Sequence, residues 1–221
     1  MQHLIVSIVA TAIVSYLIGS MNSALTLMKI IYHQDIREYG SKNAGLTNVL
    51  RVYGKKAALI TLVTDLAKGI IAVLLSRLIF TLASPEITDL RFVGFIASLF
   101  AVLGHIFPVY YKFKGGKGIL IAATTLLVTD PVVFAIVIPL FAILVAITRY
   151  VSLSSIITAS VYPFAVLITE YLRGYPQNIV LINTGLVAVI CFFLIFMHRP
   201  NIKRLREGTE NKFSFGSKKE K

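Results

Sequence analysis

Residues 119–148 read ILIAATTLLVTDPVVFAIVIPLFAILVAIT, an apolar run interrupted once, at Asp130-Pro131. A helix needs about 20 apolar residues to cross a bilayer core about 30 Å thick. Pro131 lacks a backbone N–H donor and disfavours helical backbone at Asp130, so we expect the run to break into two helices there. The first of them, 119–130, covers only about 18 Å at about 1.5 Å per residue, roughly half a crossing.

The distribution of positive charge supports this break. Lys and Arg exceed Asp and Glu by 12, and the whole excess lies in residues 29–56, 112–117 and 198–221. Short segments rich in Lys and Arg stay on the cytoplasmic side of a membrane. Two crossings within 119–148 place all three segments on that side. We therefore predict an all-α polytopic integral membrane protein with seven transmembrane helices, its N-terminus outside and its C-terminus in the cytoplasm.

Composition agrees with a membrane protein. Of the 221 residues, 57% are apolar or aromatic and 14% are charged, whereas an average soluble domain has about 25% charged residues. No basic residue precedes the first apolar run, which argues for a retained helix and against a cleaved signal peptide. We expect one transmembrane domain over 1–202 and a basic cytoplasmic tail over 203–221. The other predicted crossings are 4–28, 57–82, 92–111, 156–172 and 178–197.

A polar loop, GSKNAGLTNVLR at residues 40–51, follows the first apolar run. Backbone N–H groups, hydroxyls and a guanidinium that can bind two oxygens at once are the groups that hold a phosphate. An ordinary polar turn with one arginine that sets the topology is the alternative interpretation. The candidate ligands of a phosphate are Ser41, Asn43, Thr47, Asn48 and Arg51.

A second polar segment, FKGGKG at 113–118, directly precedes the half-length helix. That helix must begin at membrane depth, so its free N–H groups would lie in a recess open to the cytoplasm, where an anion binds well. A nucleotide P-loop is disfavoured because Gly118 stands where that motif needs Ser or Thr. A basic loop at the cytoplasmic face is the alternative to a phosphate cradle. The predicted cradle consists of Lys114, Gly115, Gly116, Lys117 and Gly118.

Three further features concern ionisable groups. Asp65 and Lys68 lie three residues apart within an apolar run and share a helix face, so we expect a buried pair with a supporting role. His198 follows the last apolar run, with Asn201 and Glu210 soon after it; by themselves these residues fit the basic end of a last crossing. The four histidines of the chain sit in separate segments without ligand spacing, so no metal site is expected.

Together these segments resemble the PlsY family, the bacterial acyl-phosphate:glycerol-3-phosphate acyltransferases. The resemblance implies an inner-membrane enzyme, without a cofactor, that moves a fatty acyl group from acyl phosphate to the 1-hydroxyl of glycerol 3-phosphate. It implies that Ser41, Arg51, His198 and Asn201 are catalytically important and that Glu210 is structurally important. It also implies that the glycines and lysines of 114–118 hold glycerol 3-phosphate. The matching blocks are Gly19-Ser20, 40–51, 65–69, 104–118, 149–155 and 198–212.

This interpretation leaves some questions open. A mixed anhydride is a reactive donor, so little general-base power is needed, and either the donor phosphate or His198 could take the proton of the attacking hydroxyl. The implied partners are membrane lipid and a soluble enzyme that produces acyl phosphate; nucleic acid is not expected. A transporter or flippase for a phosphate-bearing lipid or metabolite is the alternative, although the paired interruptions of two related halves are not evident. A non-catalytic scaffold on anionic lipid would leave Ser41 and Asn201 unexplained.

Overall fold

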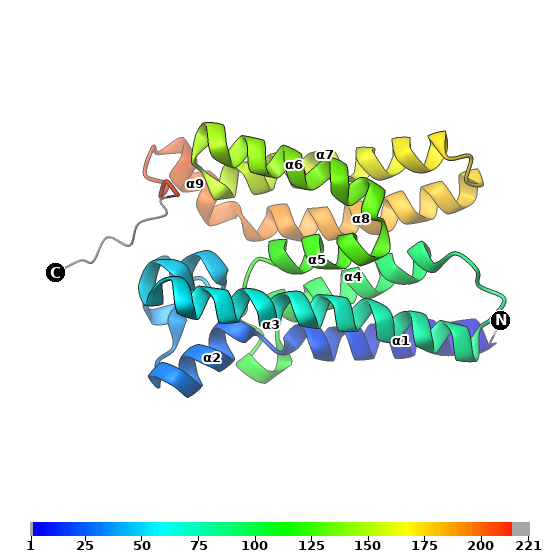
Figure 1. Cartoon of the computed structure of the whole chain (residues 1–221), viewed down its shortest axis with the longest axis horizontal. Coiled ribbons are helices and arrows are strands. Elements are labelled where there is room, and N and C mark those ends of the chain that lie inside the picture. Colours follow the sequence, from blue (N-terminus) through cyan, green and yellow to red (C-terminus); the bar gives the residue numbers. More distant parts are fainter. Residues whose placement is uncertain (1, 214–221) are drawn as a thin grey trace.

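The computed structural model describes residues 2–213, and the long elements of that range are α-helices that run side by side along one axis (Figure 1). The N-terminal end of α1 lies at one end of the bundle, and α2 and α9 lie at the other. The helices are α1 (Gln2–Ser20), α2 (Ser23–Tyr32), α3 (Leu46–Ala83), α4 (Leu90–Ile106), α5 (Ile119–Thr129), α6 (Pro131–Thr148), α7 (Val151–Leu172), α8 (Gln177–Met197) and α9 (Arg199–Arg206), with short 3-10 turns η1 (Ile36–Glu38) and η2 (Val109–Tyr111).

The predicted break at Asp130-Pro131 is confirmed. Asp130 ends α5, and its carboxylate accepts hydrogen bonds from the N–H groups of Val132 and Val133 at 3.1 and 3.2 Å, so the same residue caps α6. Pro131 occupies the first turn of α6, where its missing N–H costs nothing. In the described chain, six helical segments are long and apolar enough to cross a membrane, and α5, with 11 residues, is shorter.

The predicted crossing at 4–28 lies within a candidate membrane span over Gln2–Tyr32, which the structure divides into two helices. The chain leaves α1 at Ser20 and begins α2 at Ser23. The cause is Asn22, whose side-chain oxygen accepts a hydrogen bond from the Leu25 N–H at 3.0 Å and so caps a new helix. Hydropathy alone does not register this cap, because the residues on both sides of it are apolar.

The predicted loop 40–51 is likewise helical in its second half. Helix α3 starts at Leu46 and bends at Gly54, whose φ of 79° is outside the helical region and costs glycine little. Thr47, Asn48 and Arg51 therefore lie on a short helical segment before the bend. This segment fixes their relative positions more firmly than a loop would.

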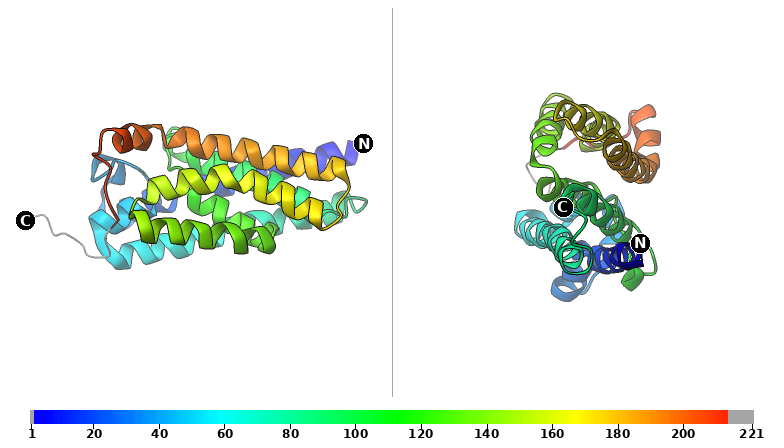
Figure 2. Two further views of the ribbon diagram at one scale, coloured as in Figure 1. Left: turned by 90° about the horizontal axis from the view of Figure 1, so that it is seen from above. Right: turned by 90° about the vertical axis from the view of Figure 1, so that its right-hand side faces the viewer.

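The helices pack in two groups, which are separated most clearly in the end view of Figure 2. Helices α1 to α5 form one group and α6 to α8 the other, and contacts of α4 with α8 and of α5 with α6 join them. Glycines allow α1 and α4 to approach closely: a methyl group at Gly19 would collide with the backbone of Ala101, and one at Gly104 with the carbonyl of Tyr16. Small residues serve helix packing in this way where lipid surrounds the bundle.

The predicted boundary between the transmembrane domain and the tail, at residues 202 and 203, falls within a short helix. Helix α9 runs from Arg199 to Arg206 and so crosses that boundary. The chain then turns back, and the N–H of Phe213 donates to the carbonyl of Arg149 at 2.6 Å. Residues 214–221 of the predicted tail lie outside the described residues.

Candidate active site

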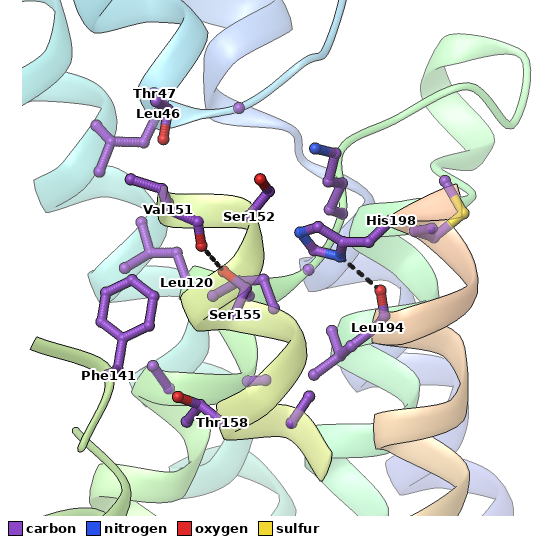
Figure 3. Close-up of a pocket in the computed structure, with 18 of the residues that line it drawn as sticks. Leu46, Thr47, Leu120, Phe141, Val151, Ser152, Ser155, Thr158, Leu194 and His198 are labelled. Atoms are coloured by element: carbon purple, nitrogen blue, oxygen red, sulfur yellow. Dashed lines mark hydrogen bonds between the residues drawn. The ribbon is translucent and has the colours of Figure 1, made fainter. Parts of the chain in front are cut away.

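A cavity of about 640 Å³ opens at the end of the bundle that bears α9. Its mouth is polar and is lined by the start of α3, the start of α5 and the chain around α9. Deeper in, it becomes a largely apolar groove between α5, α6 and α7; Figure 3 shows Ser152, Ser155 and Thr158 in a file along α7, with Leu120 and Phe141 to one side and His198 to the other. The apolar lining of this groove includes Leu120, Leu127, Phe134, Val137, Ile138 and Phe141.

The predicted residues of the first polar segment all line the mouth, but they do so in two ways. Asn48 is buried and holds the loop together: its oxygen accepts from the Ser41 N–H at 2.9 Å, and its amide donates to the carbonyls of Ile36 and Tyr39 at 3.3 and 3.0 Å. Arg51, by contrast, is exposed at the mouth. The side chains left to face a ligand are those of Ser41, Asn43, Thr47 and Arg51.

Only part of the second polar segment, residues 113–118, lines the cavity. Lys117 and Gly118 line the mouth, whereas Lys114 is exposed and is not part of the lining. The N–H groups of Gly115 and Gly116 donate to the carbonyls of Ile106 and His105 at 3.0 and 3.1 Å, so they close the loop onto the end of α4. These glycines allow close packing, because a methyl group at either position would meet His105.

The start of α5 supplies the N–H groups that the cradle was expected to provide. Gly118 has a φ of 83° and turns the chain into α5. The first N–H groups of a helix have no partner within it, and Gly118, Ile119 and Leu120 line the cavity. This helix start, with its partial positive charge, lies beside the ammonium-bearing Lys117 and suits an anion.

A chain of hydrogen bonds joins α5 to the C-terminal segment. Lys117 Nζ donates to Asn201 Oδ1 at 2.5 Å, and Asn201 Nδ2 donates to Glu210 Oε1 at 2.7 Å. The Ser152 hydroxyl donates to the same carboxylate oxygen at 2.9 Å, and Arg204 Nε donates to the other oxygen at 2.7 Å. The predicted residues Lys117, Asn201 and Glu210 are therefore neighbours, and Ser152 and Arg204, absent from the predicted set, complete the network.

This network sets the charges at the mouth. Burial raises the pKa of Glu210, but the hydrogen bonds from Asn201, Arg204 and Ser152 lower it more, so its pKa lies below the ordinary value and the carboxylate is ionised. Burial, with the charges of Arg204 and Arg51, lowers the pKa of Lys117 to about 8, although Glu210 opposes that shift. Lys117 is therefore a cation at neutral pH that is close to losing its proton.

His198 lies on the opposite wall from the apolar side chains of α5 and α6 (Figure 3). Its Nδ1 is 2.7 Å from the Leu194 carbonyl oxygen, which can only accept, so Nδ1 carries the hydrogen and Nε2 keeps a lone pair. Burial and the charge of Lys117 lower the pKa of His198 to about 4. The imidazole is therefore neutral at pH 7 and offers a hydrogen-bond acceptor.

Asp65 and Lys68 form an ion pair of 2.9 Å within α3, and both are buried. Lys68 Nζ also donates to the Met21 carbonyl at 3.1 Å, in the segment between α1 and α2. The pair thus fastens the break in the first span to α3. Asp65 and His105 reach the cavity wall from this side.

Comparison with known proteins identifies relatives over most of the chain. A family model described as glycerol-3-phosphate acyltransferase matches residues 9–208. The glycerol-3-phosphate acyltransferase of Chlorobaculum tepidum is 39% identical, with 95% of this chain and 97% of that protein covered. The enzyme of the same name from Coxiella burnetii is also 39% identical, with 92% and 97% covered.

Two solved structures share the fold. The crystal structure of PlsY, an integral membrane glycerol 3-phosphate acyltransferase, in its glycerol 3-phosphate form has a TM-score of 0.76 and 32% identity, with 94% of this chain and 96% of that chain covered. The lysophosphatidic acid form has a TM-score of 0.73 and 31% identity, with 95% and 96% covered. On these grounds the chain belongs to the PlsY family of membrane-embedded glycerol-3-phosphate acyltransferases.

Proposed function

We propose that this protein transfers a fatty acyl group from acyl phosphate to the 1-hydroxyl of sn-glycerol 3-phosphate. The products are lysophosphatidic acid and phosphate, and the reaction is the first acylation of bacterial phospholipid synthesis. The observation that carries the proposal is the cavity, in which a cationic mouth continues into an apolar groove between α5, α6 and α7. An acyl phosphate and the lysophosphatidic acid product each have one anionic and one apolar part that match it.

The mouth supplies the groups that two phosphate-bearing substrates require. Arg51 and Lys117 neutralise negative charge, and the start of α5 offers free N–H groups. Ser41, Asn43 and Thr47 orient the anions or the oxyanion that develops at the acyl carbon. Catalysis then comes mainly from holding the acceptor hydroxyl against the acyl carbon in one pocket. Asn201 and Glu210 position Lys117 for this task.

The proton of the attacking hydroxyl goes to the departing phosphate. The hydroxyl oxygen forms the new bond to the acyl carbon, the bond from that carbon to the phosphate oxygen breaks, and the phosphate leaves with the proton. A phosphate with a second pKa of about 6 is a stronger base than His198, whose pKa is lowered to about 4. Before the transfer, His198 Nε2 accepts a hydrogen bond from this hydroxyl and positions its oxygen near the acyl carbon; the proton then passes to the departing phosphate.

The same proposal includes the placement of the protein in the membrane. It crosses the bacterial inner membrane seven times, with α5 as a half-length crossing, its N-terminus outside, and the cavity mouth and basic C-terminal tail in the cytoplasm. The clustering of Lys and Arg at residues 29–56, 112–117 and 198–221 supports this orientation. A soluble enzyme on that side supplies the acyl phosphate. A reporter fused to the C-terminus that proved periplasmic would overturn the orientation.

Purified protein in detergent, given acyl phosphate and glycerol 3-phosphate, tests the reaction. Lysophosphatidic acid and phosphate should form together, and phosphate release should depend on the acceptor. Replacement of Ser41 by Ala should abolish this turnover while the protein still inserts into membranes. Failure to form lysophosphatidic acid with donors of any chain length would refute the proposed function.

A further inference from the structure

Two buried histidines line the cavity, and their Nδ1 atoms have opposite kinds of partner. The Nδ1 of His198 faces the Leu194 carbonyl oxygen at 2.7 Å, an acceptor. The Nδ1 of His105 faces the Nζ of Lys68 at 3.1 Å, a donor. His198 therefore carries its hydrogen on Nδ1, whereas His105 carries it on Nε2.

The tautomer of His105 follows from the ammonium group of Lys68, which faces its Nδ1. An ammonium has three hydrogens and no lone pair. Lys68 Nζ donates to the Met21 carbonyl at 3.1 Å, lies 3.1 Å from His105 Nδ1 and forms an ion pair of 2.9 Å with Asp65. The Gly19 carbonyl is farther away, at 3.4 Å. Because an ammonium can only donate, the His105 Nδ1 that faces it must accept, and Lys68 on α3 thereby sets the tautomer of His105.

The Nε2 edge of His105 lies beside Gly116. A methyl group at position 116 would collide with Nε2 and lie 2.6 Å from the Ala44 carbonyl oxygen, so any larger residue at this position would block that edge of the ring. Within residues 2–213, no acceptor for the Nε2–H is found, although the ring is only 4% exposed. Because His105 lines the cavity, this Nε2–H is available to an acceptor atom on a ligand bound there.

We propose that His105 Nε2–H donates a hydrogen bond to a negatively charged oxygen of the bound substrates, with Lys68 and Asp65 as the positioning residues that fix this tautomer. The inference rests on the proposed acyltransfer. Its oxygen belongs either to the phosphate of glycerol 3-phosphate or to the oxyanion that develops at the acyl carbon. The two histidines then have complementary hydrogen-bonding roles. His198 accepts a hydrogen bond from the acceptor hydroxyl, and His105 donates one to the anion.

A matched pair of substitutions tests the donor. His105→Gln keeps a side-chain N–H near the position of Nε2, whereas His105→Asn keeps only the acceptor near the position of Nδ1. We expect kcat/KM for glycerol 3-phosphate to fall about ten- to hundred-fold in H105N, the range for a lost hydrogen bond to a charged group, and H105Q to recover most of the loss. His3→Phe, at an exposed histidine in the first turn of α1, is the control and should keep wild-type rates.

Separate kinetic constants identify the oxygen. A higher KM for glycerol 3-phosphate at unchanged kcat in H105N assigns it to the acceptor phosphate, and a lower kcat at unchanged KM assigns it to the oxyanion. The proposal is overturned if H105N keeps wild-type constants, or if H105Q and H105N lose activity equally while both keep the thermal midpoint of the wild type. A wild-type protein without acyltransfer would instead refute the proposed function.

A spectroscopic measurement covers the case in which the variants fail to fold. NMR of wild-type protein with isotope-labelled histidine in detergent reports which ring nitrogen carries hydrogen. We expect His105 to be protonated on Nε2 and His198 on Nδ1, and glycerol 3-phosphate to shift the His105 signal. A hydrogen on Nδ1 of His105 would overturn the proposal.

Discussion

At the end of the bundle where α4 begins and α7 ends, Arg91 lies 3.2 Å from Asp89 and 3.4 Å from Glu170, and its guanidinium stacks over the ring of Tyr175 at 3.3 Å. Glu170 is fully buried and also accepts from Asn183 at 3.0 Å. At the cavity end, Arg51 is exposed, and no partner for it is found in the described part of the chain. Lys117, near it, has an amide oxygen as its hydrogen-bond acceptor.

The difference shows what each set of charges does. The cluster of Arg91, Asp89, Glu170 and Asn183, here called the far cluster, pairs its one cation with two carboxylates of the protein and thereby ties α4 to α7 and α8. The mouth keeps cations that the protein does not neutralise, so that anionic substrates can do so. Substitutions at the far end should therefore change stability, and those at the mouth should change turnover.

The largest expected effect is at the mouth. Replacement of Arg51 by Ala removes a guanidinium able to make two charged hydrogen bonds, each of about 1.5–3 kcal/mol, so kcat/KM should fall by roughly a thousand-fold or more. Steady-state phosphate release measures this loss. Lys55→Ala, at an exposed cation just after the bend at Gly54 and outside the cavity lining, should keep normal rates. An active R51A variant would show that the mouth does not bind substrate through this residue.

The second largest effect is expected on stability, from a substitution in the far cluster. Replacement of Glu170 by Ala leaves Arg91 buried with one carboxylate fewer, which should destabilise the protein by about 3 kcal/mol, the lower end for a broken buried pair because Asp89 stays. Thermal unfolding in detergent should show the loss, while turnover per folded molecule should stay near normal. Glu86→Ala, at an exposed acid, is the control. A stable but inactive E170A variant would contradict the division of roles between the two ends.

A smaller effect is expected when the charge that organises the mouth is removed. Glu210→Gln keeps the shape of the side chain but removes its negative charge and replaces one of the two acceptor oxygens, to which Asn201 and Arg204 donate, by an NH2 donor. We expect kcat/KM to fall about ten-fold, with the free energy of unfolding changed little. A turnover equal to that of the wild type would show that Asn201 alone positions Lys117.

The smallest effect is a pH dependence. Because the pKa of Lys117 is lowered to about 8, its positive charge is present at neutral pH and is lost as the pH rises through that value. kcat/KM for glycerol 3-phosphate should therefore decline above pH 8, and kcat should decline at higher pH because the bound anion favours the charged form. In Lys117→Arg the side chain stays charged, so a decline at the same pH in K117R would exclude Lys117 as its source.

Local chemistry explains which parts of the fold were predictable. The break at Asp130-Pro131 follows from a capping carboxylate and a missing N–H donor in two adjacent residues. The break at Asn22 depends on a cap of the same kind, but no proline marks it in the apolar sequence. The helical start of α3 at Leu46 was missed because its polar side chains resemble those of a loop.

For the site, the sequence determined which chemical groups are available and at which end of the molecule they gather, because hydropathy and charge set the topology segment by segment. Only the tertiary structure decided which of them face the substrates: Lys117 lines the cavity, and Lys114, three residues earlier, does not. Lys117 meets Asn201 84 residues away, and Ser152 meets Glu210 58 residues away. The hydrogen positions on the two histidine rings are also set by contacts, that of His105 with Lys68 and that of His198 with the Leu194 carbonyl. Such pairings arise from helix packing over long sequence separations, which local sequence patterns do not encode.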